Sequence, residues 1–190
     1  MARQEVRRWW NRFGPTFAAA IRGMRVDRMR AHTHWRWNLD EVYVKAGGEM
    51  RYLSRAVDHE GEVLESFVTT TRDKAEALSF TGRAMKRHGR PHAVVTDGLR
   101  SYGAAMKEIG GTDRQEVGRW LNNRAENSHQ PFRRRDRAME QFRRMKTLQK
   151  FAAVHGTVHN HFNQERHVIS RELYRKRRSA ALAEWREVMG

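Results

Sequence analysis

Three carboxylates lie in sequence contexts that make them candidates for a catalytic or ligand-binding role. Asp40 interrupts an otherwise apolar segment, Asp97 ends another, and Glu126 lies in the polar run 122–129. Asp is unfavourable inside strands and costly to bury unpaired, and open α/β sheets bind ligands at the carboxyl ends of their strands, where Asp97 falls. Each residue alone also has an ordinary explanation: solvent or an arginine partner for Asp40, a helix N-cap for Asp97, and a solvated helix surface for Glu126.

Brought together, the three carboxylates would define a metal site. Three carboxylates at one point repel one another unless cations lie between them. Two divalent ions supply the charge and prefer carboxylate, water and phosphate oxygens. Ions about 3.5–4 Å apart stabilise both the attacking and the leaving oxygen of an in-line phosphoryl displacement. We therefore expect two Mg²⁺ ions, with Mn²⁺ able to substitute.

The elements predicted around these residues can assemble such a site. Periodicity and turn residues predict a β-β-β-α-β-α order, with strands at 35–45, 51–57, 63–70 and 93–95 and helices at 74–88 and 100–109. Pairing of the first and fourth strands would place Asp40 beside Asp97. Asn122, Glu126 and His129 have the i, i+4, i+7 spacing of one helical face.

The flanks of this region are predicted to be helical. Residues 4–13 and 16–24 read as two short helices separated by Gly14-Pro15, followed by a basic linker. After Trp120 the chain is predicted to be mostly helix, with Pro131 ending or kinking the helix of Glu126. An amphipathic helix is expected from 171 to 188.

Charge points to nucleic acid as the partner. The 190 residues carry a net charge of +16, with 31 Arg against 7 Lys, and Arg suits bidentate phosphate contact. Residues 1–34 carry +6, 35–118 carry 0 and 119–190 carry +10. With no Cys, disulfides and thiolate zinc sites are excluded. The 38% hydrophobic content excludes a disordered basic tail, and no apolar run reaches membrane-spanning length. A cytoplasmic, nucleoid-associated protein is expected.

Several segments, in order, resemble bacterial insertion-sequence transposases of the insertion sequence six family. They include WNLDEVYVK (37–45), YLSRAVD (52–58), VTD (95–97) with SYG (101–103), and LNNRAENSH (121–129). Further similar stretches are FRRR (132–135), LQKF (148–151) and HNHFN (159–163). The resemblance implies an RNase H-like DDE catalytic core of the integrase type.

The same resemblance assigns roles to residues of this chain. Asp40, Asp97 and Glu126 would be the catalytic and metal-binding triad. Residues 34–165 would form the catalytic core, 1–33 a truncated remnant of a helix-turn-helix, and 166–190 a basic helical extension. The partners would be double-stranded DNA, as terminal inverted repeats and target, and a second copy of the chain in a homodimer. From charge and position we also expect DNA contacts from Lys45, Arg124, His129, Arg133, Arg134, Arg135, Arg137, Arg143 and Arg144.

The expected activity is metal-dependent cleavage of transposon ends and transfer of the 3′-OH to target DNA. Two alternatives stay open on the sequence alone. One is a catalytically impaired, truncated transposase that only binds DNA or dimerises as an inhibitor. The other is a nuclease of the RNase H type, which would cut RNA–DNA hybrids without strand transfer.

Overall fold

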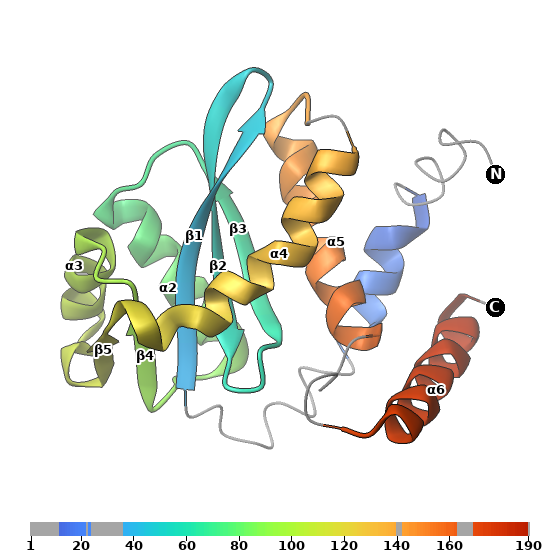
Figure 1. Ribbon diagram of the computed structural model, residues 1–190. Coiled ribbons are helices and arrows are strands. Elements are labelled where there is room, and N and C mark those ends of the chain that lie inside the picture. Colours follow the sequence, from blue (N-terminus) through green and yellow to red (C-terminus); the bar gives the residue numbers. More distant parts are fainter. Residues whose placement is uncertain (1–11, 22, 24–35, 140–141, 163–168, 190) are drawn as a thin grey trace.

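The computed structural model describes residues 12–21, 23, 36–139, 142–162 and 169–189. Its centre is a five-stranded sheet in the order β3-β2-β1-β4-β5 (Figure 1). The strands are β1 (Arg36–Ala46), β2 (Glu49–Asp58), β3 (Val63–Thr69), β4 (Ala93–Thr96) and β5 (Gln115–Val117).

The sheet is mixed, as the predicted element order requires. β1 pairs antiparallel with β2, and β2 pairs antiparallel with β3. On its other side β1 pairs in parallel with β4, which pairs in parallel with β5. The predicted β-β-β-α-β-α order is confirmed, whereas β5 was not expected from the sequence.

Two apolar cores, one on each face of the sheet, give the fold three layers. One face packs against α2 (Lys74–His88) and α3 (Arg100–Ile109), through residues such as Trp37, Leu39 and Phe80. The other face packs against α4 (Asn123–Ala138) and α5 (Met145–Phe162), through residues such as Val42, Leu53, Phe132 and Leu148. Alternate residues of β1 therefore serve different cores, which follows from the two-residue period of a strand.

Both terminal helices pack near the end of α5. Phe17, fully buried in the helix at 12–21, has its ring 5.7 Å from that of His161 in α5 and 3.6 Å from that of Trp185. Trp185 belongs to α6 (Arg171–Met189), the helix expected from 171 onward. The predicted helix at 4–13 lies mostly outside the described residues.

One predicted interruption was wrong. The described helix runs through Gly14-Pro15 without a break. Losing one N–H donor at Pro15 is offset by burial of Phe17, Ala18 and Ile21 along the same helix. At Pro131, where an end or a kink was predicted, α4 does not end but continues to Ala138, and the side chains of His129 and Phe132 on this helix are buried.

Within the described residues no helix is both long and apolar enough to cross a membrane.

Candidate active site

The parallel pairing of β1 with β4 brings Asp40 and Asp97 to the same level of the sheet. Asn38 pairs with Val95, and the two aspartates lie two residues further along their respective segments. Asp97 directly follows β4, and Gly98 turns the chain there with a φ of 89°, a conformation that favours glycine. The Asp97 Oδ1 accepts a hydrogen bond from the Leu99 amide (3.1 Å), which fixes the turn into α3. The N-cap position of α3 is Leu99, so Asp97 does not cap that helix.

Two reciprocal hydrogen bonds fasten the start of α4 to β1. The Asn122 amide donates to the Leu39 carbonyl (2.8 Å), and the Asn38 amide donates to the Leu121 carbonyl (3.0 Å). Glu126 lies in the first turn of α4, one turn beyond Asn122, with its side chain exposed. Since residues four apart share a helical face, the segment that carries Glu126 is held at the level of Asp40.

His129, another residue of this helix, contacts Asp40 directly. Its Nε2 lies 3.2 Å from the Asp40 Oδ2, and the imidazole side chain is 3% exposed. Burial lowers the pKa of His129 below its ordinary value, against the opposing effect of Asp40. This burial argues against the phosphate contact expected of His129 and favours a role in orienting Asp40.

Arg55 is the cross-strand neighbour of Asp40, and its side chain is almost completely buried. It donates to the Ser128 carbonyl of α4, and its guanidinium lies 5.0 Å from the centre of the Phe132 ring. Burial lowers the pKa of Arg55 to about 9. The sequence analysis missed this residue, although a charged side chain inside the apolar segment 53–57 is the same signal that singled out Asp40.

A second arginine lies beside Asp97. Arg72, in the loop between β3 and α2, donates through Nε to the Glu41 Oε2 (2.8 Å) and through Nη1 to the Tyr43 hydroxyl (3.1 Å). Its Nη2 is 4.0 Å from the Asp97 Oδ2. Burial raises the pKa of Glu41, and Arg72 opposes that rise. Neither Arg72 nor Glu41 was singled out by the sequence.

The donor set suits a hard divalent cation. Asp40, on the central strand β1, and Asp97, just after the neighbouring β4, supply carboxylate oxygens that are 13% and 35% exposed, and a buried imidazole supports Asp40. The side chains of Asp40, Asp97 and Glu126 do not form a group whose ligand atoms all lie within 4.8 Å of one another.

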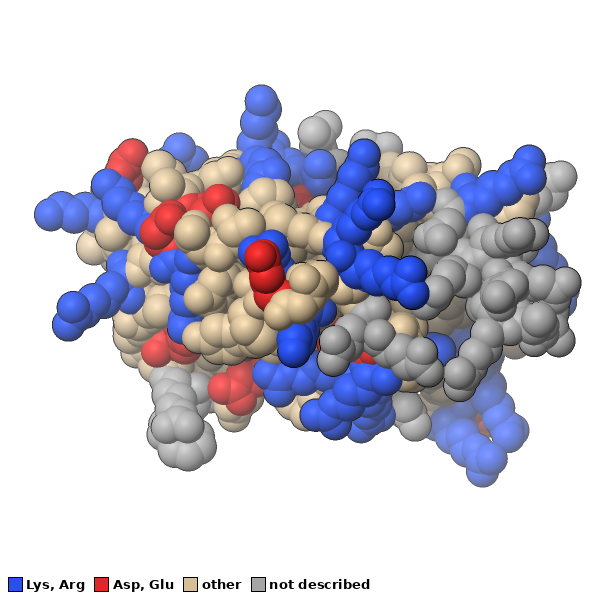
Figure 2. Space-filling model, turned by 90° about the horizontal axis from the view of Figure 1, so that it is seen from above, with Lys and Arg blue, Asp and Glu red and all other residues tan. Residues whose placement is uncertain are grey.

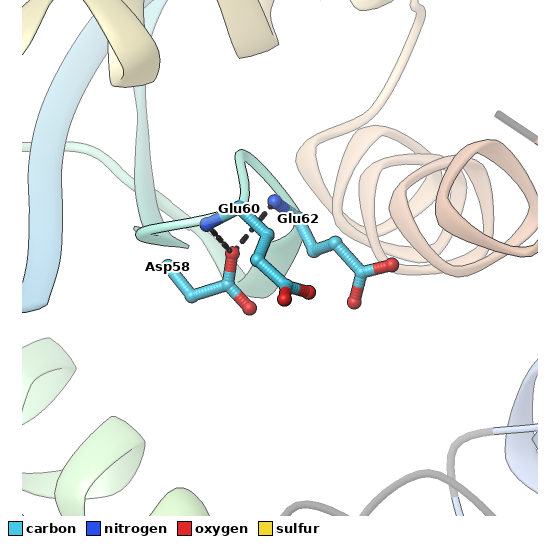
Figure 3. A group of neighbouring side chains, drawn as sticks. All are labelled: Asp58, Glu60 and Glu62. Atoms are coloured by element: carbon cyan, nitrogen blue, oxygen red, sulfur yellow. Dashed lines mark hydrogen bonds between the residues drawn. The ribbon is translucent and has the colours of Figure 1, made fainter. Parts of the chain in front are cut away.

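Among the described residues, one acidic group does meet that spacing, and it lies elsewhere. Asp58, Glu60 and Glu62 cluster in the β2–β3 turn (Figure 3). The Asp58 Oδ1 accepts hydrogen bonds from the Glu60 and Glu62 amides, each 2.9 Å long. The buried carboxylate of Asp58 therefore builds the turn.

The basic residues expected to contact DNA fall into three places. Arg124, Arg133, Arg134, Arg135 and Arg137 are exposed on α4, and Arg143 and Arg144 are exposed just before α5. Arg133 is two turns from Glu126, so the two share a face about 10 Å apart along the helix. Lys45 is exposed near the β1–β2 turn, about 17 Å of strand from Asp40 and on the opposite face. Figure 2 shows Lys and Arg side chains projecting from much of the end that carries this turn.

The mixed sheet, with β1 at its centre and parallel β4 beside it, has the strand order of an RNase H-like fold. A DDE domain family model matches residues 34–165. The chain therefore belongs to the DDE domain family, and the resemblance to insertion-sequence transposases is confirmed.

Curated relatives agree with this family. The chain is 34% identical over 101 residues to the transposase for insertion sequence-like element IS431mec of Staphylococcus aureus, covering 50% of this chain and 45% of that protein. The transposase for insertion sequence element IS257 in transposon Tn4003, also from Staphylococcus aureus, matches to the same extent. The match thus spans just under half the length of these relatives.

Solved structures share the fold at low sequence identity. The HTLV-2 integrase catalytic core domain, in complex with magnesium in its trimeric form, superposes with a TM-score of 0.52 and 14% identity. That match covers 74% of this chain and 91% of the integrase domain. The simian T-cell lymphotropic virus intasome, in complex with a regulatory subunit of PP2A, gives 0.50 and 14%, covering 73% of this chain and 51% of that chain. These likenesses establish the fold.

Proposed function

We propose that the chain is the catalytic part of a DNA transposase that cleaves transposon ends and joins the freed 3′-OH to target DNA. One observation supports this proposal: β1, which carries Asp40, pairs in parallel with β4, which precedes Asp97, and Asn122 and Asn38 tie the start of α4 to β1. Family membership and the transposase relatives support it.

In this proposal Asp40, Asp97 and Glu126 hold two Mg²⁺ ions, for which Mn²⁺ can substitute. The ions would supply a Lewis acid for the phosphodiester and a nucleophile at neutral pH. The other residues of the site position the carboxylates. Asn122 and Asn38 fix α4 on β1, His129 supports Asp40, and the Leu99 amide donates to the Asp97 carboxylate.

The DNA partners belong to the proposal as well. The exposed arginines of α4, with Arg143 and Arg144, would contact backbone phosphates of the terminal repeats and target beside the carboxylates. Two copies of the chain would act together, as a homodimer, on the two ends of the transposon. Residues 1–33 and 166–190 would flank the core at 34–165, whose bounds coincide with the family match.

Substitution of Asp97 tests the activity. Asp97→Asn keeps the size and the polarity of the side chain but removes its charge, so cleavage and strand transfer in Mg²⁺ should vanish while DNA affinity persists. Asp113→Asn, an exposed aspartate near β5, is the matched control and should retain activity. Strand transfer by the Asp97→Asn variant at the wild-type rate would refute the assignment.

The substrate separates this function from its rivals. Wild-type protein on pre-nicked transposon-end DNA should join the 3′-OH to target DNA. A chain that only binds and inhibits would join nothing, and an RNase H-type nuclease would cut RNA–DNA hybrid without joining.

A further inference from the structure

The end of the sheet near the β1–β2 turn is left uncovered on the face that elsewhere packs against α2 and α3. On this face the core includes Trp37 and Leu39 of β1. Further along, the same face carries two cross-strand pairs, Tyr43 with Tyr52 and Lys45 with Met50. Tyr43 is 55% and Met50 52% exposed.

The side chains of this surface are arranged as an aromatic platform with a basic edge. The rings of Tyr43 and Tyr52 have centroids 5.2 Å apart and are tilted by 52°. The Arg72 guanidinium lies 5.9 Å from the Tyr43 ring centre. Lys45 is exposed on the same face, and Glu41, the acidic residue of β1 on this face, is paired with Arg72.

This platform reaches the candidate active site through Arg72. Tyr43 follows Asp40 by three residues on β1, so the two side chains lie on opposite faces of the sheet. Arg72 links the platform to Asp97, because it donates to the Tyr43 hydroxyl and lies 4.0 Å from the Asp97 carboxylate. A strand of DNA with its phosphate at the carboxylates could therefore place a neighbouring nucleotide over Tyr43.

We propose that Tyr43, Tyr52 and Met50 form a stacking site for an unpaired DNA nucleotide next to the reacting phosphate, with Lys45 contacting its backbone. The inference rests on the proposed function and extends it to single-stranded DNA. Aromatic rings stack on any base, and each such contact contributes about 1–3 kcal/mol. A second copy of the chain suits the surface less well, because stable protein interfaces bury about 800 Å² on each partner and these few side chains offer far less.

Binding without catalysis tests the proposal. Two fluorescent end duplexes are compared in EDTA, one fully paired and one with four unpaired thymidines beside the cleavage position. Tyr43→Ala should weaken binding of the tailed duplex about tenfold and leave the paired duplex unchanged. Tyr43→Phe, which keeps the ring but loses the hydroxyl bonded to Arg72, should bind both as wild type does. Leu173→Ala, at an exposed apolar residue of α6, is the matched control.

Photocrosslinking locates the contact. A tail carrying 5-iododeoxyuridine should crosslink to a peptide containing Tyr43 or Tyr52. An equal loss on both duplexes, or no loss, overturns the stacking site. The proposal is also overturned if analytical sedimentation shows that Tyr43→Ala self-associates less than wild type, because the surface would then be an interface between two copies of the chain. Failure of the proposed function gives a different result from failure of the stacking site. In that case wild-type protein joins no DNA ends, whether or not Tyr43 contributes to binding.

Discussion

The imidazole of His129 lies 3.2 Å from the carboxylate of Asp40, so a helix on one face of the sheet touches the acidic residue of its central strand. The contact is buried and joins two of the elements that carry the candidate triad. We therefore expect His129 to act through Asp40 rather than through DNA. His129→Ala should lower cleavage about 10–100-fold and raise the half-saturating Mg²⁺ concentration. Gln130→Ala, an exposed neighbour, is the control, and His129→Gln should restore part of the activity. Weakened DNA binding with an unchanged Mg²⁺ requirement would instead support the phosphate contact.

Asn122 should matter for both stability and activity. Asn122→Ala removes the hydrogen bond to Leu39 and leaves a buried carbonyl without its donor. The free energy of unfolding should fall by about 1–3 kcal/mol, and cleavage should fall as Glu126 loses its fixed position. Asn127→Ala, on the exposed side of α4, should change neither in urea unfolding and cleavage assays. A stable but inactive Asn122→Ala variant would contradict a role through α4 docking.

The arginines of α4 should set the salt dependence of DNA binding. If the chain neutralises about eight phosphates, log affinity should fall against log salt with a slope of about −7. Replacing Arg133, Arg134 and Arg135 by Gln should reduce that slope by about 3. A matched triple replacement on the opposite layer, at Lys86, Arg90 and Lys107, should leave the slope unchanged. Fluorescence anisotropy over a salt series measures the slope for both triple variants. An equal reduction of the slope in the two variants would show that only net charge matters.

The two glycines of the β1–β2 turn should respond differently to alanine. Gly47 has a φ of 64°, and an added Cβ would lie 2.9 Å from the Arg143 carbonyl oxygen. Gly48 has a φ of 84° and open space around it. Gly48→Ala should therefore cost about 1 kcal/mol of backbone strain, and Gly47→Ala about 2–3 kcal/mol because the clash adds to it. Urea unfolding measures both, and equal losses would contradict close packing of the turn on the segment before α5.

Acid should destabilise the protein through His155. Burial lowers its pKa to about 3 in the folded chain, from an ordinary value of 6.5. The unfolded chain therefore binds the proton more readily, so stability is full above pH 6.5 and is lost as the pH falls toward 3. Between pH 7 and 5 this residue should account for about 2 kcal/mol.

The His155→Phe variant isolates that effect. The ring packs beside Phe132 and Phe151, so phenylalanine should fit and remove the titration. Urea unfolding at pH 7 and 5 should show the smaller loss in this variant. His92→Phe, at an exposed histidine, should keep the wild-type pH dependence. The same loss in His155→Phe as in wild type would place the acid sensitivity elsewhere.

Local signals explain why some elements could be predicted to the residue. α2 begins after Asp73, whose side chain accepts from the Glu76 amide, and ends before Gly89. α3 ends at Gly110 in the left-handed conformation. Such capping residues can be recognised from the sequence alone. β5 has no such signal, since its three residues include Gln115 and Glu116 and are extended through pairing with β4.

The residues of the candidate site also divide into some that could be predicted from the sequence and some that could not. Asp40 and Asp97 could be selected because an acid in or after an apolar strand is unusual, and the strands that precede them in the chain then pair in parallel. Burial of His129 and Arg55 could not be predicted, because it depends on how α4 lies across the sheet. Pro131 does not end α4 for a related reason, since packing of the helix on the sheet outweighs one missing backbone hydrogen bond.

The parallel pairing of β1 with β4 has a consequence for when the chemistry can begin. The hairpins from β1 to β3 can form early, because their contacts are local. The segment of Asp97 joins that of Asp40 only after β4 has crossed back to β1, and the segment of Glu126 follows only when α4 has docked. If the proposed function holds, a nascent copy on the ribosome, or one that has partly unfolded, would lack a complete site, so a host chromosome would meet the proposed cutting activity only in finished molecules.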